Sequence, residues 1–160
     1  MLFSIALLLS LASCGIYSFT GADTSGASTF SVDYFRPETA LATPVLAQSF
    51  TESLKDLILQ QSTLNISDNG ELHYEGAITS YEIAPVSVQS NETASLNRLS
   101  ITVKVVYTNT IEPSKSFERS FSKYADYDSS QDILSVEDDL NNQIIAQLTQ
   151  EIFNASLGNW

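Results

Sequence analysis

The sequence predicts an α+β domain in which two helices pack on one face of a mostly antiparallel four-stranded sheet, in the order β-α-β-β-β-α. Two segments, 44–58 and 135–153, carry apolar residues at helical spacing. The segments before and between them alternate apolar and polar residues with period two. Because each helix has a single apolar stripe, both helices most simply cover the same side of the sheet.

The first strand is expected at 29–35, where Phe30, Val32 and Tyr34 alternate with polar residues before Arg36-Pro37 ends the pattern. The first helix follows, with Thr43 as N-cap and Pro44 at its first position. One apolar stripe predicts that this helix faces the core; it consists of Leu46, Phe50, Leu54, Leu57 and Ile58.

A short strand at 64–66 and a long one at 71–83 flank the sequence Asp68-Asn69-Gly70. Asn-Gly tolerates the positive φ angles of a tight turn, so these two strands are expected to form a hairpin. The cleanest period-two alternation runs over 99–111. At ~3.3 Å per residue this strand would be roughly 43 Å long, and 117–127 is expected to return beside it as an antiparallel partner.

The second helix is expected to begin at Ser135, which forms a capping pair with Asp138. Its apolar stripe and that of the first helix should meet the long strands in one core. The residues expected to be buried there are Phe50, Leu54, Leu99, Ile101, Val103, Leu140, Ile144 and Leu148.

Composition excludes several classes of function. Seven basic residues against nineteen acidic ones give a formal charge of −12, which argues against a nucleic-acid partner because phosphate binding needs clustered Lys and Arg. A single Cys and a single His exclude a disulfide framework, Cys-rich metal sites and His-based catalytic triads. No phosphate-binding loop or nucleophile motif is present, so we expect neither an enzyme nor a cofactor.

The N-terminus predicts export. Residues 2–12 are apolar apart from two serines and carry no charge, which is too short for a membrane-spanning helix and fits a signal peptide over residues 1–13. The segment ends in Leu11-Ala-Ser-Cys14, which resembles the lipobox of bacterial lipoproteins, in which the cysteine thiol accepts the lipid. The alternative is a buried core cysteine that happens to follow a signal sequence.

A mature chain acylated at Cys14, with fatty-acyl chains such as palmitate, would be anchored to a membrane without spanning it. Residues 14–28, rich in Gly, Ser, Thr and Ala, are expected to form a lipidated tether before a single domain at 29–160. No Asp follows Cys14 directly, and by its resemblance to lipoprotein sorting signals this implies the periplasmic side of the outer membrane.

One loop has the residues of a calcium-binding loop. Oxygen-bearing side chains recur at alternate positions, but the sixth position has Gln131 where the turn requires Gly. The alternative is a polar loop whose acidic residues cap the second helix. The residues that would bind calcium are Asp126, Asp128, Ser130, Asp132 and Glu137. His73 lies in a strand without ligands near it in sequence, which favours an ordinary surface residue.

Five of the seven basic residues fall between positions 98 and 123. This cluster is the place where an anionic partner could bind, and the alternative is ordinary solvation of a long exposed hairpin. Four residues of the cluster are expected to make charge-assisted hydrogen bonds with the anionic groups of such a partner: Arg98, Lys104, Arg119 and Lys123. Arg119 and Lys123 share strand parity with Phe117 and Phe121, so a bulge, a twist or a two-sided face should separate them.

Six segments of the mature chain match the sequence pattern of a known family in their order: 14–19 (CGIYSF), 48–56 (QSFTESLKD), 74–86 (YEGAITSYEIAPV), 96–103 (LNRLSITV), 124–128 (YADYD) and 152–155 (IFNA) with the final Trp160. No single segment is a catalytic fingerprint, and their order carries the resemblance. With these segments the sequence resembles the LptE family of lipopolysaccharide-assembly lipoproteins over essentially the whole mature chain.

The resemblance implies two helices packed against a four-stranded sheet, and a protein that plugs the lumen of an LptD-type β-barrel and assists lipopolysaccharide insertion into the outer leaflet. It also implies lipopolysaccharide as a ligand in some family members, and its phosphates would then be the anionic groups that Arg98, Lys104, Arg119 and Lys123 contact. Two alternatives stay open: a non-enzymatic lipoprotein adaptor of another envelope assembly or secretion machine, and a calcium-binding envelope protein.

The lipobox gives the first testable prediction. Replacing Cys14 with Ala removes the thiol that would accept the lipid, so the variant should be unacylated and should remain uncleaved or become soluble. Metabolic labelling with a radioactive or clickable fatty acid measures this. Unlabelled wild-type protein would contradict a lipoprotein.

Overall fold

The computed structural model describes residues 21–86 and 95–158; Cys14 and the predicted signal peptide lie outside them. The α+β class is confirmed. The elements, in chain order, are β1 (Thr29–Val32), β2 (Arg36–Pro37), α2 (Pro44–Gln61), β3 (Asn65–Ile66), β4 (Leu72–Val86), β5 (Leu96–Asn109), a 3₁₀ turn (Pro113–Lys115), β6 (Phe117–Asp128) and α3 (Ile133–Leu157).

The sheet is mixed and has six strands within the described residues, where the sequence predicted four. Its order is β3-β1-β4-β5-β6, and β2 pairs separately with β4. The long strands β4, β5 and β6 are antiparallel, as predicted. The short strands β1 and β2 run parallel to β4, and β1 also runs parallel to β3. A parallel β1–β4 pair needs a crossover connection, and α2 supplies most of it.

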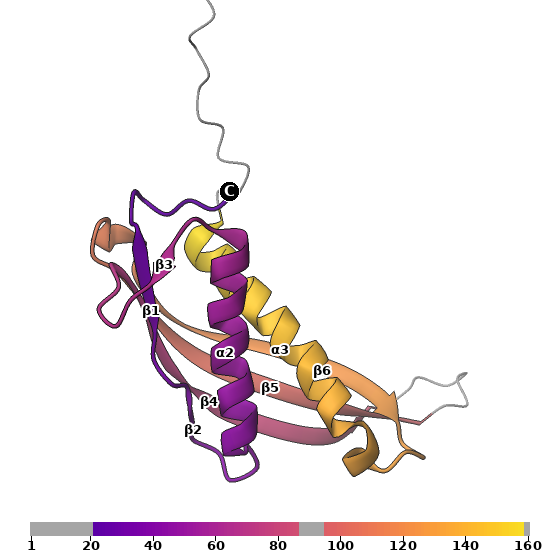
Figure 1. Ribbon diagram of the computed structural model, residues 1–160. Helices are drawn as coiled ribbons and strands as arrows, with labels where there is room; N and C mark the ends of the chain where they lie inside the picture. The colour runs from indigo at the N-terminus through magenta and orange to yellow at the C-terminus, as the bar shows by residue number, and fades with distance from the viewer. Residues whose placement is uncertain (1–20, 87–94, 159–160) are drawn as a thin grey trace, which may run out of the picture.

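Both helices lie on the same side of the sheet, as predicted (Figure 1). Thr43 caps α2 by accepting the backbone N–H of Leu46 at 3.1 Å, and Pro44 begins the helix. The predicted start of α3 is wrong by two residues. Asp132 is its N-cap, accepting the N–H of Leu134 at 3.1 Å, and the hydroxyl of Ser135 donates back to the Asp132 carbonyl. Asp is as good an N-cap as Ser, so sequence alone did not separate the two.

The predicted strand over 29–35 is shorter than expected. It splits into β1 and β2 because the side-chain alternation changes phase after Val32: Tyr34 is exposed and Phe35 is completely buried. Arg36 and Pro37, expected to end the strand, pair with Ala77 and Ile78 of β4 as a second short parallel segment.

The predicted hairpin at Asp68-Asn69-Gly70 is wrong. Strands β3 and β4 both pair with β1, one on each side of it, so the 67–71 segment crosses β1 instead of turning back. None of these residues has a positive φ angle. Gly70 is required for another reason: a Cβ there would lie 2.2 Å from the backbone carbonyl carbon of Phe30. The glycine therefore permits close passage of one backbone over another.

The core fills the space between the helices and the sheet. All eight residues predicted to be buried are buried. Two buried tyrosines link the layers through their hydroxyls: Tyr74 donates to Ser156 on α3 at 2.9 Å, and Tyr81 donates to Glu137 on α3 at 2.6 Å. Buried hydroxyls need such partners because an unpaired one costs about 1–3 kcal/mol.

Two leucines on α3 test this packing. Leu148 is fully buried and Leu134 is 78% exposed, so the same substitution has different consequences at the two sites. Leu148→Ala should lower the free energy of unfolding by about 2–5 kcal/mol, and Leu134→Ala by less than about 0.5 kcal/mol. Urea denaturation followed by circular dichroism measures both values. Equal losses would contradict the buried stripe.

Candidate functional site

The sheet face turned away from α2 and α3 has no covering layer in the described residues. We call this side of β4, β5 and β6 the open face. Its centre is a row of hydroxyls in register, Ser80, Thr102 and Ser122, and Thr102 donates to Ser122 at 3.1 Å. Ser100 and Ser120 continue it on either side. Short polar side chains make the centre of this face hydrophilic, whereas the buried apolar residues of the same strands point to the helices.

Two of the predicted lipopolysaccharide-binding residues lie on the open face, and each has an acidic partner. Arg98 makes a bidentate pair with Asp126, at 2.7 and 2.9 Å, and stacks 3.6 Å above the ring centre of Tyr124. The pair raises the pKa of Arg98 and lowers that of Asp126. Lys104 pairs with Glu118 on the neighbouring strand, which raises the lysine pKa.

The other two predicted residues lie on the opposite face, on the outermost strand β6. No bulge separates them from the aromatic residues, because the β5–β6 register is continuous. Instead, Phe121 is buried while Arg119 is exposed, with its guanidinium 5.3 Å from the ring centre of Phe117. Lys123 reaches over to α3 and pairs with Glu151 at 3.0 Å.

The basic cluster seen in the sequence is therefore not one patch. It is divided between the two faces of the sheet, and Lys115, its fifth member, pairs with Asp23 and Glu112. Within residues 21–86 and 95–158, Arg119 is the only basic residue of this hairpin without a carboxylate partner. An anion would meet Arg119 without first displacing an acidic side chain.

The residues of the possible calcium loop do not converge on one point. Asp126 binds Arg98, and Asp128 accepts both the backbone N–H and the hydroxyl of Ser130. Asp132 caps α3, and Glu137 accepts the hydroxyl of Tyr81. These separate partnerships favour the alternative, a polar loop whose acidic residues serve the fold and the start of α3.

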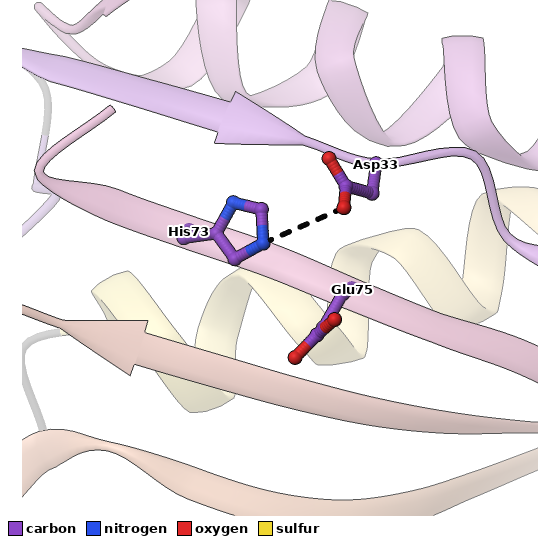
Figure 2. Close-up of side chains that lie close together, drawn as sticks. All are labelled: Asp33, His73 and Glu75. Atoms are coloured by element: carbon purple, nitrogen blue, oxygen red, sulfur yellow. Dashed lines mark ion pairs between the residues drawn. The ribbon is translucent and has the colours of Figure 1, made fainter. Parts of the chain in front are cut away.

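A different cluster, which the sequence did not indicate, lies on the uncovered side of β1 and β4. Asp33, His73 and Glu75 place one ligand atom each within 4.8 Å of one another (Figure 2). His73 and Glu75 are two residues apart on β4, and Asp33 follows the end of β1. The sequence favoured an ordinary surface residue at His73; the parallel β1–β4 pairing adds a neighbour to it by bringing Asp33 from forty positions away.

The imidazole of His73 is held from both sides. Its Nδ1 atom lies 2.8 Å from the hydroxyl of Ser31, which is buried, and its Nε2 atom lies 3.7 Å from a carboxylate oxygen of Asp33. The hydroxyl of Ser31 also accepts the backbone N–H of Gly70 at 3.2 Å. The only local sequence signal for this cluster was the spacing of His73 and Glu75, which is common on exposed strands.

No helix in the described part of the chain is both long and apolar enough to cross a membrane. The fold is similar to that of a minor lipoprotein from Acinetobacter baumannii, with a TM-score of 0.52 and 15% identity over 79% of this chain and 90% of that one. It is also similar to a hypothetical protein from Chlamydia trachomatis, with a TM-score of 0.51 and 10% identity over 82% and 99%. At these identities the likeness concerns the fold alone.

No curated protein matches the chain in sequence. The LptE family, described as lipopolysaccharide-assembly, matches residues 27–156, which span β1 to the last turns of α3. This match covers the described domain almost completely, and the family is one of non-enzymatic envelope lipoproteins. The chain therefore belongs to the LptE family of lipopolysaccharide-assembly lipoproteins.

Proposed function

We propose that this protein is an outer-membrane lipoprotein, anchored through Cys14 on the periplasmic side, that plugs and supports an LptD-type β-barrel and assists lipopolysaccharide insertion into the outer leaflet. The observation that carries the proposal is the family match over residues 27–156. A plug and support role needs binding surfaces and no catalytic group, so the composition of the chain is compatible with it.

The open face supports this proposal physically. The lumen of a membrane β-barrel is polar, so a plug must present polar groups that remain satisfied when water is displaced. The Ser80–Thr102–Ser122 row has short side chains that lose little conformational entropy on contact. The continuous pairing of β5 with β6 makes this surface a rigid one.

Site-specific cross-linking tests the partnership. A photoreactive amino acid at Ser122, in the middle of the open face, should cross-link to a large β-barrel in intact outer membranes. Mass spectrometry of the adduct identifies the barrel. An adduct with a different envelope protein, and none with a barrel, would contradict the plug and favour the alternative, a lipoprotein adaptor of another envelope machine.

For the lipopolysaccharide contact, the structure favours Arg119 among the four predicted residues. Phosphates bind arginine through charge-assisted hydrogen bonds. Arg98, Lys104 and Lys123 already neutralise a carboxylate each, and a phosphate would have to compete with it. Arg119 is exposed, and the nearby rings of Phe117 and Phe121 flank its guanidinium.

Charge reversal tests this contact. Arg119→Glu should weaken binding of purified lipopolysaccharide by tenfold or more, because an attraction is replaced by a repulsion. Lys55→Glu on α2 is the matched control, because it makes the same charge change at an ion pair with Glu52 away from β6. Binding is measured by surface plasmon resonance at several salt concentrations. Equal affinities of the two variants would reject Arg119 as the contact, without bearing on the barrel partnership.

A further inference from the structure

The Asp33, His73 and Glu75 side chains have the composition of a divalent metal site. His73 and Glu75 lie on β4 and Asp33 directly follows the paired strand β1, and all three lie on the side of the sheet away from the helices (Figure 2). Two carboxylates and one neutral imidazole supply a formal charge of −2, which matches a divalent cation. We propose that these three residues bind Zn²⁺, with water at the fourth position, and that the ion joins the end of β1 to β4.

The distances suit zinc. Zinc takes histidine nitrogen at about 2.0–2.1 Å and carboxylate oxygen at about 2.0–2.2 Å, in tetrahedral geometry, so its ligand atoms stand ~3.4 Å apart. His73 Nε2 and the nearer Asp33 oxygen are 3.7 Å apart, and all three ligand atoms lie within 4.8 Å of one another. The side chain of Asp33 is 62% exposed, so its carboxylate has room to rotate toward the ion.

The support behind the imidazole is the observation that distinguishes this cluster from scattered surface acids. A metal-binding histidine usually donates its second ring N–H to a partner that fixes the orientation of the ring. Ser31 occupies that position, 2.8 Å from Nδ1, and is itself buried. Among the described residues its oxygen accepts one hydrogen bond from the backbone, that of Gly70, so a second lone pair can accept the Nδ1 proton while Nε2 binds the metal.

The nature of the ligands selects the metal. An imidazole favours zinc and other first-row transition metals, whereas calcium and magnesium prefer sites made of oxygen atoms alone. Glu75 has no ion-pair partner within 4 Å in the described parts of the chain. The nearby Lys104 forms its ion pair with Glu118 instead. A cation arriving at the cluster therefore does not have to break an existing ion pair of Glu75.

The ion would strengthen a short junction. Strand β1 pairs with β4 through only three residue pairs, from Phe30 to Val32, and the backbone N–H of Asp33 makes one more bond to the Tyr74 carbonyl at 2.8 Å. Zinc bound by Asp33 and by two residues of β4 would hold the chain at the point where it leaves the sheet. Because it binds the folded state, it stabilises the protein by mass action.

The test uses the full chain in detergent and zinc chloride as the probe. Because His73 is the only histidine, its ring nitrogens give unambiguous ¹⁵N signals, and zinc should shift the Nε2 resonance with one-to-one stoichiometry. Zinc at a hundred times its dissociation constant should raise the melting temperature by roughly 5–10 °C. An unshifted Nε2 signal at 1 mM zinc would overturn the proposal.

Calorimetric titration of variants assigns the ligands. His73→Gln, Asp33→Asn and Glu75→Gln should each weaken zinc binding at least tenfold, and Ser31→Ala by about tenfold through loss of ring orientation. Asp56→Asn on α2 is the control for loss of one exposed carboxylate and should leave the affinity unchanged. Zinc binding of equal strength in His73→Gln and in the wild type, or equal binding of calcium, would reject the site.

Discussion

The arrangement of this domain depends on one-sided burial of its sheet. Strands β4, β5 and β6 alternate side chains between two faces, and α2 and α3 cover only one of them. Leu99, Ile101 and Val103 on β5 are completely or almost completely buried because they point toward the helices. Their neighbours Ser100 and Thr102 point away and are partly exposed. Each strand therefore has to encode an apolar face and a polar face at once, and the polar one becomes the surface that is free to bind partners.

This constraint explains which parts of the fold the sequence predicts. In helix α2 and strands β5 and β6, apolar residues recur with a strong local period. Thr43 and Pro44 make the start of α2 predictable from sequence. The parallel pairings of β1 and β2 depend instead on contacts between residues distant in sequence, such as Arg36 with Ala77, for which local pattern gives no signal. Gly70 is the clearest example: its type was noticed, but its role depends on where Phe30 lies.

The candidate sites, too, divide into features with a local sequence signal and features that depend on contacts between distant residues. Sequence analysis located the basic residues, but it could not show that Arg98 and Lys123 lie on opposite faces or that each already has a carboxylate partner. In a chain with nineteen acidic residues and seven basic ones, most cations on neighbouring strands will find an acid within reach. The sequence also carried no signal that Asp33 and His73 are neighbours, because their proximity depends on the parallel β1–β4 register.

The proposed zinc site and the first contacts of the described chain lie toward the same end of the sheet. Near the start of the described chain, Ala22 bridges to Gly158 beyond α3, and Asp23 pairs with Lys115 beside the turn that joins β5 to β6. His73 lies opposite Thr108 near this same end, whereas the Arg98–Asp126 pair lies toward the other end of β5, a strand of fourteen residues or ~46 Å. If Cys14 carries a lipid anchor, a force on the anchor would reach the described chain at this end. The bridge to Gly158 and the ion pair with Lys115 would then resist that force before it reaches β1. A zinc ion on Asp33 would secure β1 itself, which pairs with β4 through only three residue pairs.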